Sequence, residues 1–188
     1  MLYNRPYFCN INHQPQKYMK SKPEKKVYCV YIEFEPYLYE WLLFQSKGKF
    51  PVYFPKLSIE NRILQTFLME LPPNAVPVCN EECAVPIGIP KLKNIDPEVH
   101  NYLPIGAKQE IHENVRHRFI IEFWGDIHRT CNIGKRKDKL IEAFMETHGI
   151  EVNDKNYNTL HKIYMRERAN YYKRKQRSKS KKSKRFQF

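Results

Sequence analysis

The sequence predicts an α+β fold in which a small strand-helix-strand-helix module precedes a three-helix, helix-turn-helix-like module and a disordered basic C-terminal tail. Three observations lead to this prediction: a β-branched and aromatic run, several amphipathic stretches, and a concentration of positive charge near the C-terminus. Hydrophobic residues make up 41% of the 188 residues, enough for a packed core. We expect a polar arm at 1–26, an α+β module with an irregular hairpin at 27–103, a tri-helical basic module at 104–177 and the tail at 178–188.

The first module is predicted from alternating strand and helix patterns. Residues 27–34 are β-branched and aromatic, which favours a strand. A helix is expected at 36–44, with proline at its first turn, and a short strand at 50–54. Ser58 is a candidate N-cap for a helix at 59–71, whose apolar residues recur on one face.

Prolines recur between residues 74 and 105, which predicts an irregular edge hairpin followed by a loop. The short apolar pieces 75–79 and 84–89 are its expected strands. Cys79 and Cys83 lie at its centre, but no second closely spaced pair completes a zinc site. These cysteines are therefore interpreted as free thiols.

Three helices are expected after Pro104. The first, at 106–129, carries a stripe spaced by four residues: Ile111, Val115, Phe119, Phe123 and Ile127. The second, at 135–148, ends at Gly149, and Asn153 or Asp154 is expected to cap the third, which runs to about Gln176. A helix, a glycine-containing turn and a basic helix form the pattern of a helix-turn-helix. The turn is longer than the usual three or four residues, so no particular helix-turn-helix family is indicated.

Positive charge is concentrated in the last part of the chain. Residues 135–188 contain 17 Lys and Arg against 6 Asp and Glu, whereas residues 1–134 contain 16 against 14. Such asymmetry is typical of a chain that binds a polyanion. We therefore expect a nucleic-acid partner, with DNA favoured over RNA.

The candidate interface consists of polar and cationic residues on the second helix, the third helix and the tail. Phosphate contacts are expected at the start of the second helix from Lys135, Arg136, Lys137 and Lys139. Base-edge contacts are expected from the early third helix, at Asn156, Asn158, Thr159 and Lys162. Contacts along the groove are expected from Arg166, Arg168, Asn170, Lys173, Arg174, Lys175 and Arg177. Sequence-independent anchoring is expected from Lys179, Lys181, Lys182, Lys184 and Arg185.

Two other functions remain open from the sequence. Tyrosines alternate with cations at 164–174, a pattern suited to stacking on unpaired bases of RNA or single-stranded DNA, although Tyr164 and Tyr171 also continue an apolar helix face. The chain could instead be a structural or assembly protein whose basic tail contacts nucleic acid. The α+β module would then scaffold or form a homo-oligomer.

An enzyme is not expected. His112 and His117 are five residues apart, whereas a zinc-binding pair on one helix face requires four. The chain lacks a phosphate-cradling glycine loop and an acidic constellation for metal-dependent hydrolysis, so neither a cofactor nor a metal is expected. The sequence contains no run of about 18 apolar residues, so no membrane-spanning helix is expected.

The start of the chain lacks the apolar run of a signal peptide, which favours a cytoplasmic protein, or a nuclear one in a eukaryotic host. The Lys-, Asn-, Ile- and Tyr-rich composition suits an AT-rich genome such as that of a phage or mobile element.

Overall fold

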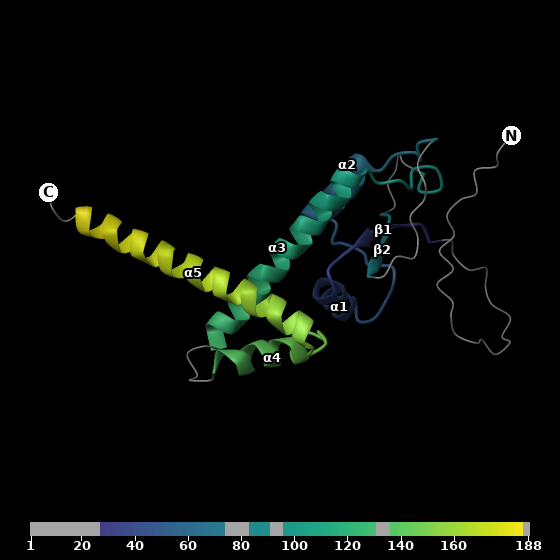
Figure 1. The fold of residues 1–188 in the computed structure, drawn as a ribbon. Helices are drawn as coiled ribbons and strands as arrows, with labels where there is room; N and C mark the ends of the chain where they lie inside the picture. Colours follow the sequence, from purple (N-terminus) through teal and green to yellow (C-terminus); the bar gives the residue numbers. More distant parts are fainter. Residues whose placement is uncertain (1–26, 74–82, 91–95, 131–135, 186–188) are drawn as a thin grey trace. The chain divides into compact units, whose positions relative to one another are not determined.

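The computed structural model describes residues 27–73, 83–90, 96–130 and 136–185, with side chains up to Ser178 (Figure 1). These residues form a mixed α+β fold that is mostly helical, with five helices and one two-stranded antiparallel sheet. The chain divides into two compact units, 1–117 and 118–188, so the division falls within helix α3 (Ile105–Thr130). The sequence had placed the boundary before this helix, at residue 104.

The sheet of the first unit joins β1 (Cys29–Glu33) to β2 (Ala84–Gly88), with Val30 opposite Ile87. Both strands contribute buried side chains to the core, including Val30 and Ile87 themselves. The strand predicted at 50–54 is wrong, because only Val52 forms a bridge there, parallel to Ile87. Prolines at positions 51 and 55 lack a backbone N–H, which limits any further pairing.

Two helices complete the core of this unit. The first, α1 (Pro36–Gln45), confirms the predicted helix and buries Tyr37, Leu38, Trp41 and Leu42. The second, α2 (Ile59–Phe67), begins at the predicted N-cap, since the Ser58 hydroxyl accepts a hydrogen bond from the Asn61 N–H at 3.1 Å.

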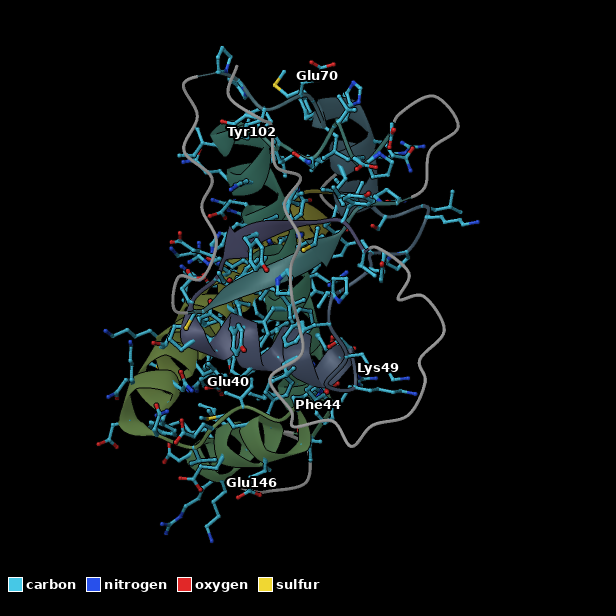
Figure 2. The ribbon with its side chains drawn as sticks, turned by 90° about the vertical axis from the view of Figure 1, so that its right-hand side faces the viewer. Glu40, Phe44, Lys49, Glu70, Tyr102 and Glu146 are labelled. Atoms are coloured by element: carbon cyan, nitrogen blue, oxygen red, sulfur yellow. The ribbon has the colours of Figure 1, made fainter. Side chains whose placement is uncertain are left out.

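Helix α2 ends four residues earlier than predicted. The chain becomes extended at Leu68, and Met69 pairs with Tyr102 through two backbone hydrogen bonds of 3.0 and 3.1 Å. Figure 2 shows Glu70 and Tyr102 at the same end of the unit. The pairing with a distant segment therefore replaces the last helical turn.

Helix α3 confirms the long helix predicted at 106–129, and its predicted stripe is buried. Within the first unit the helix is held to the start of α1 by His112, whose Nε2 lies 2.7 Å from the carboxylate of the N-cap residue Glu35. The His112 ring also stacks on Phe34, with ring centroids 5.4 Å apart. Glu35 thus has a structural partner in His112.

The second unit contains the end of α3, α4 (Lys137–Thr147) and α5 (Asp154–Arg185). Its core is aromatic: the Phe144 ring lies edge-on to Phe119 and Phe123, at centroid distances of 5.9 and 5.0 Å. Leu160 and Ile163 of α5 are also buried. Helices α3, α4 and α5 therefore all contribute buried side chains to this unit.

Helix α5 is longer than predicted, because it continues past residue 176 to Arg185. The expected disordered tail is therefore helical from Ser178 to Arg185. No glycine or proline occurs between 154 and 185 to stop the helix, and Lys, Arg and Gln are good helix formers.

Candidate nucleic-acid interface

The start of α4 carries three of the predicted phosphate ligands. Arg136 is the N-cap, Lys137 and Lys139 lie in the first turn, and burial of Leu140 and Phe144 fixes the orientation of the helix. Arg136 and Lys139 are exposed, whereas Lys137 is half-buried. Cations are disfavoured by the positive end of a helix dipole, so a bound anion here would relieve their repulsion. Lys135 lies outside the described residues.

Tyr157 in the first turn of α5 connects α5 to this end of α4. Its hydroxyl donates a hydrogen bond of 3.1 Å to the Asp138 carboxylate. Burial, this hydrogen bond and the charges of Asp138 and Glu142 together raise the pKa of Tyr157. The bond aligns the cationic start of α4 with the start of α5.

Asn156 is buried, which argues against the prediction that its side chain meets base edges. The side chain is only 2% exposed, and its amide donates to the Glu151 carbonyl at 3.1 Å. Its backbone N–H in turn donates to the Asn153 side chain at 2.8 Å, so Asn153 caps α5 as one of the two predicted candidates. Asn156 thus secures the turn between α4 and α5.

The exposed face of α5 carries a row of cations, here called the basic stripe: Lys155, Lys162, Arg166, Lys173 and Arg177. They follow one another at intervals of seven, four, seven and four residues. At 3.6 residues per turn, these intervals keep the side chains within about 40° of one line along the helix. The buried residues Leu160 and Ile163 lie on another face.

Sequence reasoning missed Lys155, the first member of the basic stripe. The signal was present, because Lys155 stands seven residues before Lys162 and eleven before Arg166. At 1.5 Å per residue the stripe from Lys155 to Arg177 spans about 33 Å, close to one turn of B-form DNA. Its charges are thus spread over a length that a duplex can match.

The cations of the basic stripe differ in their acidic neighbours. Arg166 Nε lies 3.8 Å from the Glu167 carboxylate. Within the part of the chain that the structure describes, no carboxylate forms an ion pair with the ammonium group of Lys155, Lys162 or Lys173. The other predicted polar residues vary: Asn158 is exposed, Thr159 and Asn170 are half-buried, and the Thr159 hydroxyl donates to the Lys155 carbonyl at 2.8 Å.

Acids on α3 are engaged within the unit. Glu122 lies 3.2 Å from Nε2 of His148 and Asp126 lies 3.6 Å from it, while Arg129 forms an ion pair with Asp126. The His148 ring also stacks on Phe144, with centroids 3.9 Å apart. These contacts hold the end of α4 against α3 and keep two carboxylates away from α5's exposed face.

The tyrosines of α5 have different environments. Tyr171 packs against Trp124 and His128, with ring centroids 6.0 and 4.9 Å apart. Tyr172 is half exposed, and the Arg168 guanidinium lies over its ring at 5.8 Å. Tyr171 therefore continues the packed face, and only Tyr172 presents a ring to solvent in this stretch.

Beyond Tyr172 the predicted residues Lys173, Arg174, Lys175 and Arg177 are all exposed. Lys175 also approaches the Tyr171 ring, at 5.9 Å from its centroid. For the predicted anchoring residues Lys179, Lys181, Lys182, Lys184 and Arg185, the structure describes the helical backbone only.

Among the residues that the structure describes, no three His, Cys, Asp or Glu side chains gather closely enough to hold a metal ion. Nor does any helix of the described ranges combine the length and apolar character needed to cross a bilayer. Comparisons with protein-family models, curated proteins and solved structures give no match to this chain.

Proposed function

We propose that this chain binds nucleic acid, with double-stranded DNA as its principal ligand, through a helix-turn-helix-like arrangement of α4 and α5. The observation that carries the proposal is the basic stripe, a row of exposed cations on a different face of α5 from its buried residues. Such a row matches the regular negative charge of a duplex.

The contacts follow from the positions of the side chains. The stripe cations other than Lys162 neutralise phosphates along the duplex, and Arg136 and Lys139 add contacts from the start of α4. Asn158 and Lys162, exposed near the start of α5, meet base edges in the major groove. A protein with these contacts would serve in transcriptional regulation or as an accessory factor in replication or recombination.

The packed position of Tyr171 argues for the duplex over single strands. A base-stacking platform requires an accessible aromatic face, and Tyr171 places its ring against Trp124 and His128. RNA or single-stranded DNA binding, and a purely structural role, are outcomes that the following experiment distinguishes.

The test is a salt titration of binding to duplex DNA, single-stranded DNA and RNA by the full chain and a stripe variant, Lys162→Gln with Arg166→Gln and Lys173→Gln. A matched control removes three exposed cations from the first unit, as Lys49→Gln with Lys56→Gln and Arg62→Gln. Figure 2 labels Lys49 just beyond the end of α1.

We expect wild type and control to prefer duplex DNA. The stripe variant should bind more weakly, with its log–log salt slope reduced by about 0.9 for each lost phosphate contact. Equal binding by the stripe variant and the control would contradict the proposed interface. A stronger preference of the wild type for single strands or RNA would support the alternative ligand, and no binding at all would leave only the structural role.

A further inference from the structure

Helix α5 continues well beyond its last packed residue. Among the described side chains of α5, Tyr171 is the last that is half-buried, in contact with Trp124 and His128, and every residue from Tyr172 to Ser178 is exposed. The helix nevertheless extends to Arg185, and Figure 1 shows its yellow end leading away from α4. The segment 172–185, here called the free helix, has no packed face among its described side chains.

The distribution of charge changes at the same point. Before Tyr172 the stripe cations lie along one face of α5, whereas Arg174 and Lys175 are about 100° and 200° from Lys173 around the helix axis. Cations therefore surround the free helix, and its sequence contains no acidic residue.

Cations on all sides of the free helix favour its binding in a groove rather than on a flat surface. A helix lying on a flat anionic surface uses one face, and the cations on its far side remain in water. The major groove of B-form DNA is about 12 Å wide, close to the diameter of an α-helix, and has phosphates along both edges. The major groove of A-form RNA is too narrow to accept a helix.

Repulsion between neighbouring cations opposes the helical conformation of the free helix. Cations three and four residues apart, such as Arg174 with Arg177 and Lys173 with Arg177, repel each other on a helix. Phosphates on both sides would offset this repulsion and favour the helical conformation. A duplex ligand would thus stabilise the conformation that the structure shows.

Building on the proposed DNA binding, we propose that the free helix enters the major groove as a helix and neutralises phosphates of both strands. It is a structured part of the interface, in contrast to a flexible tether that holds any polyanion. The packed turns of α5 before Tyr172 set the direction in which it leaves the second unit.

The test changes the helix and keeps every charge. Gln176 is exposed, and proline at this position removes a helical hydrogen bond and clashes with the preceding turn. Full-length Gln176→Pro is compared with Gln176→Ala, which preserves the helix. Binding to a short duplex and to a single strand of the same length is measured by fluorescence anisotropy, together with thermal unfolding.

We expect Gln176→Pro to weaken duplex binding by about tenfold, the effect of losing roughly two phosphate contacts at moderate salt. Single-strand binding and the thermal midpoint should match those of Gln176→Ala, because Gln176 lies beyond the packed core. Duplex binding by Gln176→Pro equal to that of Gln176→Ala would overturn the inference and leave the DNA-binding proposal intact. Equal losses for duplex and single strand would also overturn it. Failure of the wild type to bind duplex DNA would reject the underlying proposal itself.

Discussion

The hydroxyl of Tyr157 lies 3.1 Å from the Oδ1 atom of Asp138, so one hydrogen bond joins the first turns of α5 and α4. The same two turns carry Arg136 and Lys139 on one helix and Asn158 on the other. A hydrogen bond between two half-buried side chains thereby positions two exposed sets of proposed DNA ligands.

Tyr157→Phe should lower the free energy of unfolding by about 1 kcal/mol, because it removes this hydrogen bond and leaves Asp138 without its donor. The measurement is chemical denaturation near neutral pH. Tyr172→Phe is the matched control, since it removes a hydroxyl from a half-exposed tyrosine on the same helix. Equal losses for the two variants would show that the Tyr157 hydrogen bond has no special role.

Stability at alkaline pH should also depend on Tyr157. Burial first, and then the hydrogen bond to Asp138, raise the pKa of this tyrosine in the folded chain, so folding favours its protonated form. The stabilisation is complete below the unfolded-state pKa near 10 and is lost as the pH rises through the folded-state pKa. Unfolding free energy should therefore fall more steeply above about pH 10 in the wild type than in Tyr157→Phe. Parallel pH profiles would contradict this linkage.

Asn156 and Asn158 form a natural pair for separating folding from binding. Asn156→Ala should lower the free energy of unfolding by about 1–3 kcal/mol, because a buried hydrogen-bonded amide is lost. Asn158→Ala should leave stability unchanged and weaken binding to a selected duplex site by about 1–3 kcal/mol, the value of a base contact. Denaturation and anisotropy on both variants give the comparison. Unchanged site binding by Asn158→Ala would remove this residue from the interface.

The contrast between these two asparagines shows where prediction from sequence stops. Both are polar residues at the start of a helix that follows a polar turn. The helical period places Asn156 on the packed face, but its polar side chain indicates the exposed face, so the sequence alone does not decide between them. Its burial depends on acceptors that the turn supplies, the Glu151 carbonyl and the Asn153 side chain. Such local geometry is set by three-dimensional packing.

Long periodic stretches were predicted well. The four-residue spacing of apolar residues located α3, and the proline at the first turn located α1, because both signals act within one helix. Features that depend on distant partners were not predictable. The last turn of α2 is replaced by the Met69–Tyr102 pairing, and the strand expected at 50–54 is reduced to the Val52 bridge.

The N-cap of α2 allows a test of whether the first unit contributes to binding. Ser58→Ala should lower the free energy of unfolding by about 1 kcal/mol, since it removes the acceptor for the Asn61 N–H, whereas Ser58→Asp should retain the cap. Duplex binding at a temperature where both variants are folded should equal that of the wild type. Weaker binding by Ser58→Ala alone would show that the first unit takes part in recognition.

Tyr171 and Tyr172 distinguish packing from base stacking on adjacent residues. Tyr171→Ala should destabilise the protein by about 1–3 kcal/mol, less than for a fully buried aromatic, because its ring packs against Trp124 and His128 and remains only half-buried. Tyr172→Ala should change the free energy of unfolding by less than about 0.5 kcal/mol, because its ring is half exposed.

If duplex phosphates are the main ligand, neither change should selectively reduce single-strand affinity. A stacking platform predicts the reverse: Tyr172→Ala would then cost about 1–3 kcal/mol of single-strand affinity at unchanged stability. Paired unfolding and single-strand titrations of the two variants therefore decide which face of the aromatic–basic segment meets the nucleic acid.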